Sequence, residues 1–321
     1  MRKYRHFAIG VLAYTLAVIL WGALVRATGS GAGCGQHWPL CNGQVVPRDP
    51  ILATVIELTH RVTSGLILVA AIGLVVLARR NFPRGHPVQK AAWVTLGLVI
   101  VEAAVGAGIV LLQLVAANAS ALRAGYIAVH LVNTLLLVAA LTTTVWLAGL
   151  GREWNPATAE PRSRRPLRVG LGLMLVVSAS GAIVSLGDTL FPGTSLAAGL
   201  AADLDPTAHF LVRLRIWHPL IAVGVGLYVM MIAARHLGVG PPTTRRIART
   251  VVALVATQWL IGLSNLIFLA PIGLQLVHLG VANLLWIALV ALYLAVAATA
   301  EGAVHSPSDL ERERTATGSL T

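Results

Sequence analysis

Charged residues are scarce in this chain of 321 residues: they make up 11% of the sequence, against 57% hydrophobic residues. A soluble protein of this size would need far more charge on its surface, so the composition excludes a soluble globular fold. The mean hydropathy is +0.80, and apolar segments long enough to cross a membrane recur along the whole chain. Cysteine is scarce as well, since Cys34 and Cys41 are the only two.

Eight apolar stretches predict eight transmembrane helices, because helices satisfy their own backbone hydrogen bonds in lipid. The stretch nearest the N-terminus follows basic residues, as in a signal peptide, but it is too long for one and no clean small-residue cleavage site follows it. The predicted fold class is therefore an all-α integral membrane protein. The predicted spans are residues 7–25, 52–78, 91–113, 125–149, 169–187, 211–234, 250–270 and 273–299.

Most of the 24 Lys and Arg residues fall in the N-terminus, the tail and the segments 79–90, 150–168 and 235–249. Positive charge concentrates on the cytoplasmic side of membrane proteins, so both termini are predicted to be cytoplasmic and the protein to be a multi-pass protein of the cell (inner) membrane. The net charge of +12 then marks orientation and does not indicate nucleic-acid binding. Six arginines remain on the outer side: Arg26, Arg48, Arg61, Arg123, Arg213 and Arg215.

Four sequence elements recur at a nearly constant separation, which predicts an internal duplication. We expect an N-terminal half at 1–150, a cytoplasmic linker at 151–168, a C-terminal half at 169–300 and a disordered tail at 301–321. With four helices each, the halves are predicted to be pseudo-symmetric four-helix bundles related by an axis along the membrane normal. The matching elements are Gly22-Ala23-Leu24-Val25 with Gly181-Ala182-Ile183-Val184, His60 with His218, Glu102 and Gly106 with Gln258 and Gly262, and His130-Leu131 with His278-Leu279.

Four histidines lie near the starts of helices that enter from the outer side: His60, His130, His218 and His278. A single histidine in a membrane helix is more often a polar packing residue. Four of them at repeat-related positions favour two metal sites instead. A neutral imidazole is a good axial ligand for haem iron, and two facing helices can supply one each.

Glu57 stands three residues before His60, and residues three apart share a face of a helix. Arg215 stands three residues before His218, so only the first pair has a carboxylate beside it. A carboxylate at the membrane edge suggests function. The alternative is an ion pair with Arg61, four residues further on.

Carboxylates are nearly absent from the predicted spans, where Glu57 and Glu102 are the only two. A di-iron bundle needs two Glu-x-x-His motifs and two further glutamates, so that class of site is excluded. Glu102 leaves two interpretations open, a proton relay or a hydrogen bond to a neighbouring helix. Its repeat partner Gln258 favours the hydrogen bond.

The outer side also carries arginines and the two cysteines. Guanidinium groups bind carboxylates bidentately, so Arg26, Arg61, Arg213 and Arg215 are candidates for binding the propionates of a haem; snorkelling to the interface is the alternative.

Cys34 and Cys41 lie outside the reducing cytoplasm, and a disulfide is expected. It would either close a Gly-rich loop, which we favour, or exchange with thiols.

These residues resemble the haem A synthase family over about residues 1–300. The resemblance rests on residues 22–31, on the Cys34 to Cys41 loop, on Glu57-Leu58-Thr59-His60-Arg61, and on the other three histidines. It implies eight helices in two pseudo-symmetric halves, and oxidation of the C8 methyl of haem O to a formyl group to give haem A for cytochrome oxidase. It also implies that His60 and His130 flank the substrate haem, that His218 and His278 bind a haem b cofactor, and that Glu57 is catalytic.

The predicted function is therefore that of a haem A synthase, an oxidoreductase of haem biosynthesis. Its expected partners are haem O, membrane lipid, an electron acceptor outside the chain and a haem O synthase that supplies the substrate. One alternative is a di-haem b-type cytochrome that only transfers electrons, for instance from quinol, and has no need of Glu57. A transporter with parallel repeats would show broken helices near mid-span, and the sequence has no paired Gly or Pro interruptions there.

Overall fold

The computed structural model describes residues 1–150, 161–238 and 240–304, with side chains at 1–150, 164–238 and 240–298. Over these ranges the chain is helical and contains no strand, and eight helices are long and apolar enough to cross a membrane. The prediction of an all-α protein with eight spans is confirmed. The long helices are α1 (Arg2–Ala27), α2 (Leu52–Asn81), α3 (Pro87–Leu111), α4 (Ala121–Leu150), α5 (Pro161–Leu190), α8 (Trp217–Ala234), α9 (Pro242–Ile267) and α10 (Ile272–Val304).

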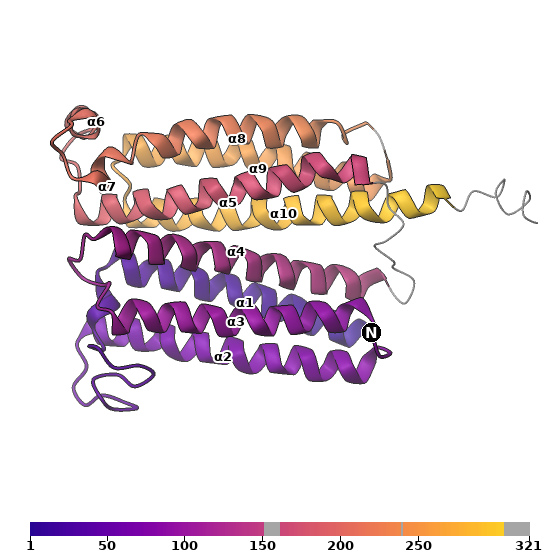
Figure 1. Ribbon diagram of the computed structural model, residues 1–321, viewed down its shortest axis with the longest axis horizontal. Helices are drawn as coiled ribbons and strands as arrows, with labels where there is room; N and C mark the ends of the chain where they lie inside the picture. The colour runs from indigo at the N-terminus through magenta and orange to yellow at the C-terminus, as the bar shows by residue number, and fades with distance from the viewer. Residues whose placement is uncertain (151–160, 239, 305–321) are drawn as a thin grey trace, which may run out of the picture.

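The long helices form two groups of four that lie side by side (Figure 1). In the first group α1 and α3 each pack against α2 and α4, so α2 and α4 are diagonal to one another. In the second, α5 and α9 each pack against α8 and α10, which are likewise diagonal. Helices α4 and α10 meet between the groups, and α1 also contacts α10 and α5. The packing order is thus the same in both halves; the symmetry axis that relates them stays a prediction.

Three short elements lie at one end of the bundle: η1 (Ser30–Ala32), α6 (Leu196–Leu204) and α7 (Phe210–Arg213). This end also carries the Cys34–Cys41 loop, and we call it the disulfide end. The sixth predicted span, 211–234, is divided here, because α7 ends at Arg213 and α8 begins only at Trp217. Arg215 lies in the intervening turn.

Two predicted boundaries lie next to residues that the structure does not describe. Residues 161–168, expected to be linker, already belong to α5. A helix can begin at Pro161 because the first N–H groups of a helix have no intrahelical partner in any case. The rest of the linker, 151–160, and residues 305–321 of the expected disordered tail lie outside the described residues.

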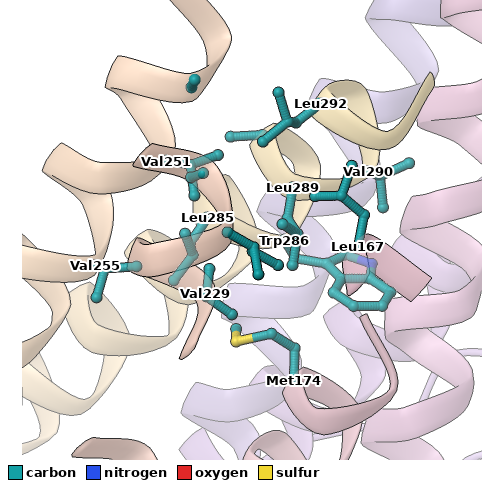
Figure 2. Close-up of a cluster of buried hydrophobic side chains, with 14 of the residues drawn as sticks. Leu167, Met174, Val229, Val251, Val255, Leu285, Trp286, Leu289, Val290 and Leu292 are labelled. Atoms are coloured by element: carbon teal, nitrogen blue, oxygen red, sulfur yellow. The ribbon is translucent and has the colours of Figure 1, made fainter. Parts of the chain in front are cut away.

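Each half has its own apolar core. The core of the second half joins α5, α8, α9 and α10 around side chains such as Leu289, Val229 and Val251 (Figure 2). It also includes Leu135 and Val138 of α4. The Trp286 indole N–H of α10 donates to the carbonyl of Leu135 at 2.7 Å, so a hydrogen bond also links the halves in this core. Many large apolar side chains remain exposed on the outside of the bundle, as lipid-facing helices require.

Candidate functional site

The four predicted histidines all lie at the disulfide end, within the first three turns of α2, α4, α8 and α10. These four helices begin at that end (Figure 1). Because α2 and α4 are diagonal in one bundle and α8 and α10 in the other, each half places two histidines on opposite corners. The ring centroids of His218 and His278 are 6.5 Å apart and the ring planes meet at 79°, so these two rings lie close together in an edge-to-face arrangement.

Each histidine ring packs against a glycine of an adjacent helix. A Cβ on Gly22 would lie 2.8 Å from Cε1 of His60, and one on Gly181 would lie 2.9 Å from Cε1 of His218. Cβ atoms on Gly106 and Gly262 would lie 3.7 Å and 3.4 Å from Cε1 of His130 and His278. The four glycines are the ones that the sequence repeat singles out. The repeat therefore preserves a histidine together with the space that its ring occupies.

Polar side chains contact three of the four rings. Nδ1 of His130 lies 3.5 Å from Oε1 of Glu102, and Nε2 of His278 lies 3.1 Å from Nε2 of Gln258. Glu102 and Gln258 are repeat partners, as are His130 and His278. The two histidines therefore have neighbours at matching positions of the repeat. Nδ1 of His218 is hydrogen-bonded to the Ser180 hydroxyl at 2.9 Å, a residue that sequence reasoning missed although it adjoins Gly181.

Glu57 is buried at the start of α2, with 3% of its surface exposed. Its Oε2 accepts a 2.8 Å hydrogen bond from the backbone N–H of Cys34. Its Oε1 accepts from Nε of Arg61 at 3.1 Å and from Nη2 at 2.5 Å. The ion pair that the sequence left as an alternative is thus present, and the carboxylate is held by both a cation and the loop.

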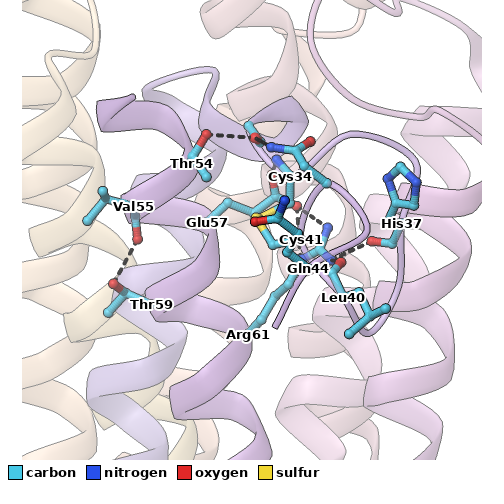
Figure 3. The surroundings of a disulfide bond; sticks show 12 residues. Cys34, His37, Leu40, Cys41, Gln44, Thr54, Val55, Glu57, Thr59 and Arg61 are labelled. Carbon is cyan, nitrogen blue, oxygen red and sulfur yellow. Dashed lines mark hydrogen bonds and ion pairs between the residues drawn. A yellow bond between two sulfur atoms is a disulfide. The ribbon is translucent and has the colours of Figure 1, made fainter. Parts of the chain in front are cut away.

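Arg61 also connects α2 with the disulfide loop, since its Nη1 donates to the carbonyls of His37 and Leu40 (Figure 3). The Cys34–Cys41 disulfide is formed, as predicted. Gly33 lies directly on α2: a Cβ there would be 2.5 Å from the carbonyl carbon of Ala53. The loop therefore covers Glu57 through backbone contacts.

Arg26 and Arg215 have partners that the sequence did not indicate. Nη1 of Arg26 donates to the Ser185 carbonyl and the Thr189 hydroxyl, both at 2.7 Å, and Nη2 donates to Oε1 of Gln275 at 3.0 Å. All three partners belong to the other half. The terminal nitrogens of Arg26 thus bind protein groups between the halves, and its role in binding a propionate stays a prediction.

Arg215 pairs with two aspartates that sequence reasoning missed. Its Nη1 lies 3.4 Å from Asp188 and its Nε 3.6 Å from Asp203, and Nη2 donates to the carbonyl of Phe191 at 3.0 Å. Burial raises the pKa of Asp203 above its usual value, and the positive charge of Arg215 opposes that shift. Arg213 makes a longer bond, 3.4 Å, to the Pro206 carbonyl. The first half thus has a carboxylate held by an arginine, and the second half an arginine held by carboxylates.

Comparison with known proteins agrees with this arrangement. A family model described as cytochrome oxidase assembly protein (COX15-CtaA) matches residues 5–52 and 51–290. The chain belongs to this family. It is therefore a multi-pass membrane protein of a family named for cytochrome oxidase assembly.

Named relatives match the chain over different lengths. A protoheme IX farnesyltransferase of Thermus thermophilus is 45% identical over 300 residues, which are 92% of this chain and 48% of that protein. The heme A synthase of Staphylococcus epidermidis is 40% identical over 114 residues, 35% of this chain and 38% of the relative. That of Alkalihalophilus pseudofirmus is 41% identical over 103 residues, 32% and 33% of the two chains. The chain thus spans about half the length of the Thermus relative, and these alignments cover about a third of the two heme A synthases.

The residues of this family member fit the two haem groups that its histidine pairs predict. The buried Nδ1 atoms of His60, His130 and His278 have no hydrogen-bond partner, and a buried polar atom without a partner calls for a ligand. The glycines beside all four rings leave room for each imidazole against an adjacent helix. Among the described residues no group of three or more His, Cys, Asp or Glu side chains could hold a metal ion. Axial ligation of a haem iron needs only two side chains, so the paired histidines are the residues that would hold such a group.

Proposed function

We propose that this protein is a haem A synthase, an oxidoreductase that converts the C8 methyl group of haem O into the formyl group of haem A. The observation that carries the proposal is the difference between the two halves. Both supply a histidine pair with matching glycines, but only the first has a buried carboxylate, Glu57, three residues before its histidine. We assign the substrate to His60 and His130, and a haem b cofactor to His218 and His278.

Oxidation of a methyl group next to a porphyrin creates positive charge on that carbon. A fixed carboxylate stabilises such charge and can accept a proton from the reacting carbon. Glu57 suits this role because Arg61 and the Cys34 amide fix its position, while Oε2, which accepts only from the Cys34 amide, retains a further lone pair. The disulfide loop excludes water from this carboxylate by covering it.

With water as the oxygen donor, a methyl group and one water give a formyl group, four protons and four electrons. Haem b supplies one-electron transfer when it is bound. An electron acceptor outside the chain receives the electrons. In the second half Arg215 replaces the carboxylate, and Asp188 and Asp203 hold it in place. A haem propionate bound by Arg215 would share the guanidinium with these aspartates.

The Thermus relative suggests where the substrate comes from. That protein is named for farnesyl transfer to protohaem IX, and this chain matches 48% of it. We infer that the matched part is the oxidising half of that protein and that a farnesyltransferase works beside it. A haem O synthase is then the expected partner, because haem O is apolar and would pass between the two proteins within the lipid.

Expression in a host that makes haem O, followed by extraction and identification of the haems, tests the proposal. We expect haem A in the membranes and haem b bound to the purified protein. Bound haem b without any haem A would show that the di-haem cytochrome is the correct function.

Substitution of Glu57 tests its role directly. In Glu57→Ala we expect haem b to remain bound and haem A to be lost. Glu57→Gln keeps the shape of the side chain and its hydrogen-bond acceptor but removes the charge, so loss of haem A in this variant too would identify the charge as the requirement. Unchanged haem A yield in both variants would remove Glu57 from the mechanism.

A further inference from the structure

Glu102 lies at mid-span in α3 with its carboxylate directed at His130 of α4. Oε1 is 3.5 Å from Nδ1 of His130. Oε2 accepts a hydrogen bond from Nδ2 of Asn133 at 2.5 Å, and the Thr134 hydroxyl donates to Oε1. Asn133 and Thr134 follow His130 by three and four residues, so all three side chains lie on one face of α4. Glu102 is therefore bound to the same surface that presents the histidine.

The corresponding position of the second half carries an uncharged side chain. Gln258 of α9 lies 3.1 Å from Nε2 of His278 and donates to the backbone carbonyl of the same residue at 3.1 Å. Both residues contact the repeat-related histidine, Glu102 at Nδ1 of His130 and Gln258 at Nε2 of His278, but only Glu102 is a carboxylic acid. Both oxygens of Glu102 accept hydrogen bonds from α4, and the same carboxyl group places an acidic residue beside His130, where the second half has a neutral amide beside His278.

A carboxylate beside the outer nitrogen of a ligating histidine increases the electron density on that ligand. Greater ligand basicity and nearby negative charge stabilise the oxidised iron, and they lower the reduction potential of the site. The effect is strong at this position, because the field of a charge is weakly screened between apolar helices. A neutral amide has no comparable effect.

We propose that Glu102 is a positioning residue that orients His130 and makes the haem site of the first half more reducing than that of the second. This inference rests on the proposed function, which places one haem in each half. The difference in charge between Glu102 and Gln258 then sets the direction of electron transfer. A haem held by His60 and His130 would then be the electron donor, and one held by His218 and His278 the acceptor. Substrate oxidation in the first half and electron exit from the second require this order.

Spectroscopic redox titration of the purified haem-loaded protein tests the proposal with two opposite substitutions. Glu102→Gln is expected to raise the lower of the two midpoint potentials and leave the other unchanged. Gln258→Glu is expected to lower the higher potential and leave the first unchanged. Glu102→Asp, which retains the charge, should restore most of the wild-type value. Together the two glutamine–glutamate exchanges assign each potential to a half.

The proposal is overturned if Glu102→Gln binds both haems with unshifted potentials. If that variant loses haem, Gln258→Glu decides instead, and an unshifted potential there overturns the proposal as well. A failure of the proposed function can be distinguished from a failure of this inference. Wild-type protein that binds two haems, shows the predicted shifts and forms no haem A would refute the synthase activity and leave the role of Glu102 standing.

Discussion

Arg26 of α1 donates a hydrogen bond to the carbonyl of Ser185 of α5, and the two residues are 159 positions apart. Gly22 and Gly181 are separated by the same number of residues, so Arg26 and Ser185 occupy equivalent positions of the repeat. The two halves therefore touch at corresponding points, where the first carries arginine and the second serine. Gln275 of α10 completes the contact by accepting from both side chains.

Replacing Arg26 with leucine should weaken the association of the halves and leave both haem sites loaded. The substitution leaves Gln275 and the Ser185 carbonyl without a charged donor, which we expect to cost about 3 kcal/mol. Thermal unfolding in detergent measures the loss. Ser185→Ala is the matched control, because it removes the serine hydroxyl and keeps the carbonyl that Arg26 binds; its effect should be about 1 kcal/mol. Loss of a haem from the Arg26 variant would instead support the predicted propionate role.

Adding a methyl group at Gly22 should displace His60. Its Cβ would lie 2.8 Å from Cε1 of the imidazole, closer than side-chain atoms normally approach, so the ring must move. We expect Gly22→Ala to reduce the haem bound in the first half, as measured by absorbance and by haem extraction. Gly10→Ala on the same helix meets no atom within 4 Å and should bind haem normally. Equal haem content in the two variants would contradict the proposed site.

A methyl group at Gly33 should push the disulfide loop away from α2. Its Cβ would lie 2.6 Å from the backbone nitrogen of Thr54, and overpacking of this kind costs about 1–3 kcal/mol. We expect the Cys34 amide to exchange its hydrogen faster with solvent in Gly33→Ala, because its bond to Glu57 is lost. Gly65→Ala, with no atom within 4 Å, is the control. An unchanged exchange rate would show that the loop tolerates the displacement.

Two aspartates near α6 should give opposite pH dependence. Burial raises the pKa of Asp203 above 3.8 despite the positive charge of Arg215. Ionising this carboxyl therefore costs more in the folded loop than in the unfolded chain, and the loop loses stability as the pH rises from 3.8 through the folded pKa. The pKa of Asp205 is lowered, first by the hydroxyl of Thr207 and then by its backbone amide, so its stabilising effect is lost as the pH falls through its folded pKa. At pH 7, Asp203→Asn should slow hydrogen exchange of residues 196–213 and Asp205→Asn should accelerate it. Both differences should shrink at pH 3; the same sign for both variants would contradict this assignment.

The spans, the histidines and the disulfide could be predicted because each depends on local sequence. Apolar length predicts a helix in lipid, and the spacing of Glu57 and Arg61 by four residues already indicated their ion pair. The glycines beside the histidines were visible as repeat elements, although their contact with the rings was not.

The partners of Arg26 and Arg215 could not be predicted, because they are far away in the sequence. Gln275 is 249 residues from Arg26, and nothing in the local pattern connects them. Arginines at a membrane boundary suit propionates, lipid headgroups and protein carbonyls equally, so only the packing of the helices distinguishes these partners. Asp188 is a similar case, since it lies one residue beyond the span predicted for its helix.

The bond between Arg26 and Ser185 has a consequence for the evolution of the chain. The terminal nitrogens of Arg26 take their acceptors from the second half, at Ser185, Thr189 and Gln275. In two copies of the first half two arginines would meet at this contact, and in two copies of the second half there would be none. Once the copies had diverged in this way, each half fitted only the other, and a single polypeptide guarantees that they meet in equal numbers.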